Sequence, residues 1–100
     1  MMRTKIFAKG RTYDVHAFLE EDFSVTIKKG GTISSDAGTS ISGKVRALRE
    51  DRTCVSEDGI INKDIHFKSV STAACFVTGT MSNGFKVWKY EKTNKLIERV

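Results

Sequence analysis

The first third of the chain alternates between apolar and polar residues, which is the pattern of strands with one buried face. β-Branched and aromatic residues on both sides of a Gly-Arg turn at 10–11 predict a hairpin formed by residues 5–9 and 12–19. Residues 17–22 also fit a helical turn, so two alternatives stay open for the end of the second strand.

A third strand is predicted at residues 23–28, where alternate residues from Phe23 to Ile27 are apolar. The Lys-Lys-Gly-Gly run at 28–31 supplies the glycines for a turn. The polar residues 34–40 then predict a loop with exposed backbone amides, which is available for contact with a ligand.

The best helix is predicted directly after Ser40, whose hydroxyl would cap the first turn. Its apolar stripe consists of Ile41, Val45 and Leu48. Arg46 and Arg49 lie three residues apart on one flank, which is a solvated face or a contact for phosphate.

A second helix is predicted at residues 70–78. Ser69 can accept a hydrogen bond from an amide of the first turn, and Gly79 can adopt the left-handed conformation that ends a helix. An Asn-Gly pair at 83–84 favours a turn, and the alternation of residues 85–90 favours a strand after it.

Trp88 has two possible roles. On the predicted strand it shares a face with Lys86 and Tyr90, and an indole beside lysines can stack on an unpaired or extruded base. A lone tryptophan in a small domain also commonly packs in the core. The sequence favours the core position for the ring and leaves the lysines for contact.

The other segments predict a short hairpin of residues 53–55 and 60–61, a brief strand at 65–67, and a tail at 92–100 that is a strand or a frayed helix. Together these elements predict an α+β fold, a small, mainly antiparallel β-sheet of about five to seven strands with two short helices packed on one face. A chain of 100 residues makes a single domain, residues 1–100.

The stretch from 67 to 89 resembles the C-terminal signature of the restriction-enzyme adenine-methylase-associated (RAMA) domains, and of a related domain of unknown function that follows GIY-YIG nucleases. The matching residues are Ser69, Ser71, Ala73, Ala74, Gly79, Asn83-Gly84 and Trp88-Lys89. Val70 stands where those families usually have proline. The resemblance extends upstream to residues 23–31, so residues 22–100 form the RAMA-like module and residues 1–21 an N-terminal extension hairpin.

The chemistry of the chain favours binding over catalysis. The formal charge of +5 makes nucleic acid the first candidate partner. Two cysteines and two histidines do not form the spacing of a zinc site, and no nucleophile is paired with a base, so we expect no catalytic residue, metal or cofactor. Thiols without a pairing pattern and the lack of a membrane-length apolar run indicate a cytoplasmic protein.

The resemblance implies a module that recognises DNA, with methylated DNA in restriction or phage biology as a special case. The residues expected to neutralise phosphates are Lys28, Lys29, Arg46, Arg49, Lys86 and Lys89. Those expected near the site that reads the base are Ser69, Asn83 and Trp88. The alternative is a small phage-type inhibitor or adaptor that binds a host defence or nucleic-acid enzyme through salt-tolerant contacts. The oligomeric state stays open.

Overall fold

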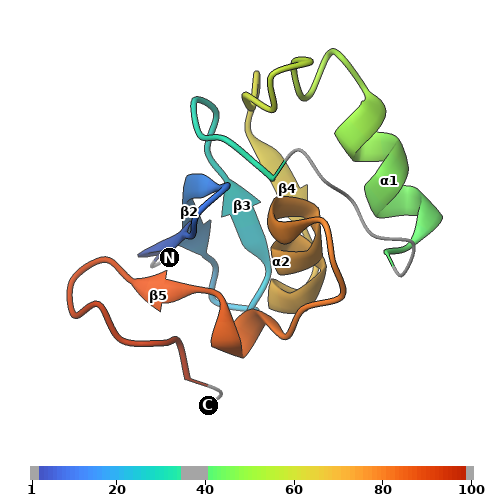
Figure 1. The fold of residues 1–100 in the computed structure, drawn as a ribbon. Coiled ribbons are helices and arrows are strands. Elements are labelled where there is room, and N and C mark those ends of the chain that lie inside the picture. The colour runs from blue at the N-terminus through green and yellow to red at the C-terminus, as the bar shows by residue number, and fades with distance from the viewer. Residues whose placement is uncertain (1–2, 35–40, 99–100) are drawn as a thin grey trace.

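Residues 3–34 and 41–98 are described by the computed structural model. Five strands form one antiparallel sheet in the order β4-β3-β2-β1-β5 (Figure 1). The strands are β1 (Thr4–Lys9), β2 (Asp14–Leu19), β3 (Val25–Ile27), β4 (Ile65–Phe67) and β5 (Lys89–Tyr90). The helices are α1 (Gly43–Glu50), α2 (Val70–Thr78) and the short 3-10 helix η1 (Gly84–Lys86).

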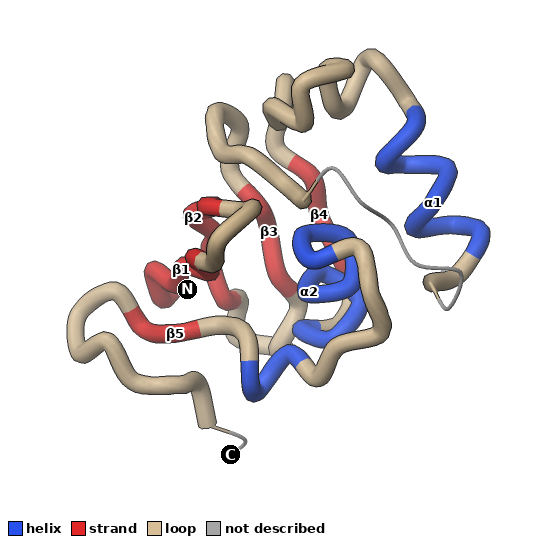
Figure 2. Tube along the Cα trace, viewed as in Figure 1, coloured by secondary structure: helices blue, strands red, loops and turns tan. Residues whose placement is uncertain are grey.

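Both α-helices lie on the same side of the sheet, and long loops join the elements (Figure 2). Helix α2 packs against β3 and β4, and α1 packs against α2. The apolar core lies between the sheet and α2, where Trp88 and Phe76 are the largest fully buried side chains. The small α+β fold expected from the sequence is therefore confirmed.

The N-terminal hairpin forms the middle of the sheet. β1 pairs with β2 along its whole length, β2 pairs with β3, and β1 pairs with β5. β2 remains a strand up to Leu19, so the alternative of a helical turn from residue 17 is wrong. Ile6, Ala8, Val15 and Ala17 are buried towards the helices because side chains alternate between the two faces of a strand.

The caps of α2 confirm the predicted helix. The Ser69 hydroxyl accepts a hydrogen bond from the Thr72 amide at 3.0 Å, and Gly79 ends the helix with φ of 78°. The predicted strand at 85–90 is wrong except for its last two residues. The Asn83 side chain accepts a hydrogen bond from the Phe85 amide at 3.0 Å and starts η1 instead of a hairpin turn.

Helix α1 begins two residues later than expected, because the hydroxyl that caps it belongs to Ser42, which accepts a hydrogen bond from the Val45 amide at 3.3 Å. Ser40 and most of the predicted loop at 34–40 lie outside the described residues. None of the helices within residues 3–34 and 41–98 has the length and apolar content needed to cross a bilayer.

Two minor predictions also correspond to the structure. The hairpin after α1 is reduced to a single antiparallel pairing of Val55 with Ile61, and Gly59 makes its turn with φ of 82°. The C-terminal tail returns as a strand-like segment, because Leu96 pairs with Lys89 and the Ile97 amide donates to the Trp88 carbonyl at 3.0 Å.

Candidate nucleic-acid interface

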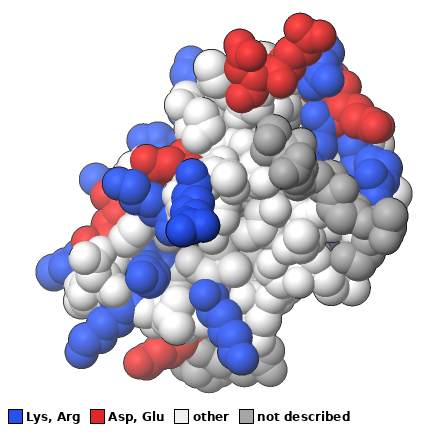
Figure 3. Space-filling view, in the orientation of Figure 1, with Lys and Arg blue, Asp and Glu red and all other residues white. Residues whose placement is uncertain are grey.

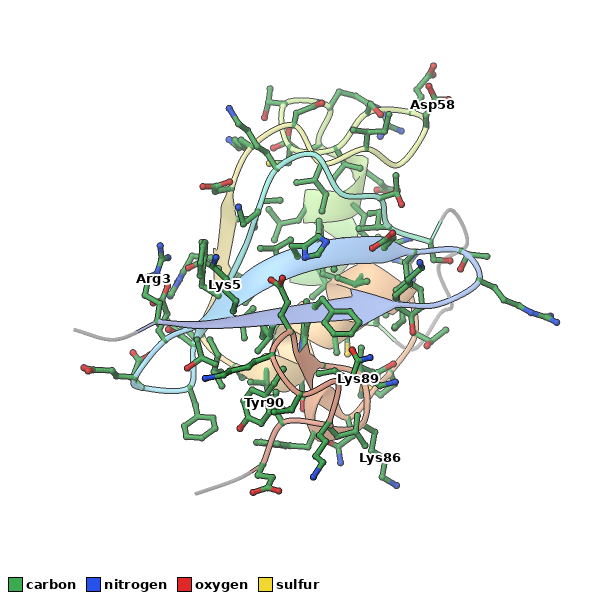
Figure 4. All side chains as sticks on the ribbon, turned by 90° about the vertical axis from the view of Figure 1, so that its left-hand side faces the viewer. Arg3, Lys5, Asp58, Lys86, Lys89 and Tyr90 are labelled. Atoms are coloured by element: carbon green, nitrogen blue, oxygen red, sulfur yellow. The ribbon has the colours of Figure 1, made fainter. Side chains whose placement is uncertain are left out.

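The helices cover one face of the sheet and leave the other open to solvent. Figure 4 looks onto this open face, with both helices behind the strands. Since Ile6 and Ala8 of β1 point into the core, their neighbours Lys5, Phe7 and Lys9 point outwards. The same alternation on β2 exposes Asp14 and His16 and leaves Phe18 half-buried. We call this surface the open face.

Pairing between strands arranges four residues of the open face in a first row. The row consists of Lys28, His16, Phe7 and Lys89. His16 of β2 pairs with Phe7 of β1, and Phe7 pairs with Lys89 of β5. On the other side, the Lys28 amide just past β3 donates to the His16 carbonyl at 2.9 Å. Paired residues place their side chains on the same face, so two rings lie between two lysines.

A second row runs beside the first, displaced by two residues along each strand. It consists of His66, Thr26, Phe18 and Lys5. The Lys28 ammonium lies 5.4 Å from the centre of the Phe18 ring, and the Arg3 guanidinium carbon lies 4.2 Å from it. Such cation–π contacts fix basic groups above the aromatic surface.

Hydrogen bonds hold the second row in place. Arg3 donates to both oxygens of Glu20, at 2.6 Å to Oε2 and 2.9 Å to Oε1. The Thr26 hydroxyl donates to Glu20 at 2.8 Å and lies 3.0 Å from Nδ1 of His66. Because that hydroxyl proton is directed to the Glu20 carboxylate, Nδ1 of His66 is the hydrogen-bond donor to the Thr26 oxygen. The hydrogen bonds from Arg3, then Thr26, lower the pKa of Glu20 below its ordinary value.

The first row borders two shallow hollows that share Asp14 and His16. One hollow is completed by Phe7, Lys9 and Glu91. The other is completed by Lys28, Lys29, Gly30 and Gly31. The His16 side chain is 58% exposed, and its Nδ1 lies 3.4 Å from a Glu91 oxygen.

Basic side chains are numerous along the edge of the molecule that carries the open face (Figure 3). Acidic side chains gather at the top of the same view, over the loops that follow α1. Within the part of the chain that the structure describes, Lys5, Lys28 and Lys89 have no ion pair with a carboxylate. Their ammonium groups are therefore available to an external anion.

The predicted phosphate contacts divide between two regions. Lys28, Lys29 and Lys89 are exposed on or beside the open face, and Lys86 is exposed on η1 below it (Figure 4). Arg46 lies on α1, behind the sheet, where it lines a cleft with Arg52 and Ser56.

Arg49 holds α1 against the rest of the fold. Its guanidinium donates to the backbone carbonyls of Ser34 and Phe76, and the residue is only 8% exposed. Burial lowers the pKa of this guanidinium, with a smaller effect from Arg46. We therefore assign Arg49 to the architecture and leave it out of the set of phosphate contacts proposed below.

The three residues expected near a reading site all make structural contacts at the ends of α2 and η1. Ser69 and Asn83 cap these two helices, as described above. Trp88 is completely buried, and its Nε1 donates to the Val70 carbonyl at 3.0 Å. The core position favoured for Trp88 is therefore confirmed, and the ring is not available for stacking on a base.

Sequence reasoning missed the aromatic part of the open face, above all Phe7, His16 and Phe18. The signal was present in the alternation of β1 and β2, because an inward Ile6 and Ala17 require an outward Phe7 and His16.

No group of three or more His, Cys, Asp or Glu side chains in the described ranges is close enough to hold a metal ion. Cys54 and Cys75 are both buried free thiols. His66 is held by Thr26.

The fold and its surface define a small α+β module with one helix-covered and one open sheet face. The chain belongs to the family described as Domain of unknown function (DUF4357), whose family model matches residues 6–99. That match includes nearly all of the N-terminal hairpin. Comparisons with curated proteins and with solved structures gave no match.

Proposed function

We propose that the chain is a non-enzymatic DNA-binding module that acts in the cytoplasm and uses the open face as its contact surface. The observation that carries this proposal is the first row, in which the neighbouring rings of Phe7 and His16 lie between Lys28 and Lys89. Lysines that form no ion pair with a described carboxylate can bind phosphates, and exposed aromatic rings can stack on bases. Lys29 and Lys86 extend the basic surface at its edges.

The resemblance to RAMA domains adds a finer proposal, that the module prefers adenine-methylated DNA in a restriction or phage setting. In this proposal the RAMA-like motif acts indirectly. The contacts of Ser69, Asn83 and Trp88 fix α2 and η1, and η1 leads directly into β5, which carries Lys89.

The test is fluorescence anisotropy of labelled DNA, single-stranded and duplex, unmodified and adenine-methylated, at low and moderate salt. A Lys5→Ala, Lys89→Ala variant removes two charges from the open face. A Lys44→Ala, Lys63→Ala variant removes two exposed charges elsewhere and serves as the matched control. We expect the first variant to bind more weakly and to reduce the slope of log affinity against log salt by about 1.5. The control should keep the wild-type slope.

Absence of binding to every DNA at low salt would contradict the proposal, as would an equal loss in both variants. The inhibitor or adaptor alternative predicts an exposed apolar patch. The large apolar residues exposed within the described ranges are Ile60, Met81 and Leu96, which lie in three separate segments of the sequence.

A further inference from the structure

The shape of the open face restricts the form of nucleic acid that it can bind. The major groove of a duplex admits a helix or a two-stranded ribbon, and the bases inside the duplex are stacked on each other. The rings of Phe7 and His16 lie instead in the middle of a five-stranded sheet, flanked by β3 on one side and β5 on the other. A sheet surface that is five strands wide does not enter a groove, so its rings can reach only unpaired bases.

Unpaired bases match the chemistry of the first row. The centres of the Phe7 and His16 rings are 6.5 Å apart with an angle of 36° between their planes, so each offers a separate surface to a base. Open sheets that present aromatic rings stack unpaired bases in this way, independently of base identity.

The charges of the open face define where the backbone of such a strand passes. Asp14 and Glu91 lie beside His16 and disfavour phosphates in the middle of the first row. Lysines lie at both ends of the row, which spans about 14 Å across four strands. Lys28 and Lys29 line the hollow at one end, and Lys89 occupies the other.

We propose that the open face binds single-stranded nucleic acid, with bases stacked on Phe7 and His16 and phosphates held by Lys28 and Lys89. This inference rests on the proposed function and narrows its ligand to unpaired strands. DNA and RNA strands share the required chemistry, and the two are separate arms of the test.

The test compares labelled oligothymidylate, oligouridylate and a blunt DNA duplex of equal length by fluorescence anisotropy at fixed salt. The variants are Phe7→Leu, which keeps an apolar side chain without a ring, and the exposed His16→Ala. Phe85→Leu makes the same change at a half-buried ring on η1 that packs against Phe23 with ring centres 6.2 Å apart, and it is the control. Circular dichroism verifies that each variant is folded.

We expect at least one single strand to bind about 10-fold or more tightly than the duplex. Phe7→Leu and His16→Ala should each weaken that binding by about 5- to 150-fold, the effect of losing one stacked base, and Phe85→Leu should not. Tighter binding of the duplex than of either single strand, or unchanged binding by both open-face variants, overturns this inference. The proposed DNA binding then still stands if the Lys5→Ala, Lys89→Ala variant binds DNA more weakly. No binding to any of the three ligands overturns both.

Discussion

Gly84 shows how closely η1 packs against the first turn of α2. The Gly84 amide donates a hydrogen bond to the Ser71 hydroxyl at 3.1 Å. A Cβ at this position would overlap the Val70 carbonyl carbon and lie 2.7 Å from the Ser71 amide nitrogen, which is closer than real Cβ atoms approach other atoms. The glycine is therefore required by the approach of η1 to the first turn of α2, where Trp88 also binds.

Replacing Gly84 with alanine should destabilise the fold, because backbone atoms of α2 would have to move. We expect a loss of about 1–3 kcal/mol or more in the free energy of unfolding measured by urea denaturation. Gly43→Ala is the control, since a Cβ on this residue at the start of α1 meets nothing within 4 Å. Similar stabilities for the two variants would contradict the proposed close packing.

At the scale of elements, most short-range features could be predicted from the sequence. The hairpin, β3, β4 and both caps of α2 follow from alternation and from the properties of Ser69 and Gly79. The region after Asn83 could not be predicted, because an Asn-Gly pair is compatible with a hairpin turn and with a helical cap. Burial of Trp88 against α2 favours the helical cap. The hydrogen bond from the Trp88 indole to the Val70 carbonyl joins residues that are 18 positions apart in the sequence.

The candidate site was predicted less completely for a similar reason. Basic charge and the family resemblance predict Lys28, Lys29 and Lys89 as phosphate contacts, but their arrangement with Phe7 and His16 depends on the order of strands in the sheet. Arg49 could not be distinguished from Arg46 by its spacing, since the carbonyls that it binds come from Ser34 and Phe76 in distant segments.

Helix α1 should depend on Arg49 for its attachment. Arg49→Met keeps most of the side-chain volume but removes both donors from buried carbonyls, so we expect a loss of about 2–4 kcal/mol in unfolding free energy. Lys44→Met, an exposed change on the same helix, should alter stability by no more than about 0.5 kcal/mol. Thermal or urea unfolding of the pair measures the difference, and equal stabilities would refute the anchoring role.

The link between Arg3 and Glu20 should appear as a dependence of stability on pH. Because the pKa of Glu20 is lowered in the folded protein, the folded state binds fewer protons than the unfolded state near that pKa. The contribution of the Glu20 carboxylate to the stability of the fold is fully present above the ordinary carboxyl pKa. This contribution disappears as the pH falls through the lowered pKa of Glu20 in the folded protein. Glu20→Gln should therefore show a weaker loss of stability on acidification than wild type, measured by urea unfolding over an acid pH series. An unchanged profile, like that expected for Glu57→Gln on an exposed loop, would contradict the link.

At the scale of the whole molecule, the two faces of the sheet differ in their surroundings, because the helices cover one face and the other is open to solvent. One face supports the core and α2, where the Ser71 hydroxyl binds the Gly84 amide and the Trp88 indole binds the Val70 carbonyl. The other face is built mainly by β1 and β2 and presents rings between lysines. Since the family match covers residues 6–99, both faces belong to the same family module.

Binding at the open face is tested most directly by an amide chemical-shift map of the ¹⁵N-labelled protein titrated with a short oligothymidylate. We expect the largest changes on the open face, at residues 5–9, 14–18 and 28–29 and at Lys89. We expect small changes on α1 and around the cleft at Arg46. Changes concentrated on α1, or none at low salt, would show that the open face is not the binding surface.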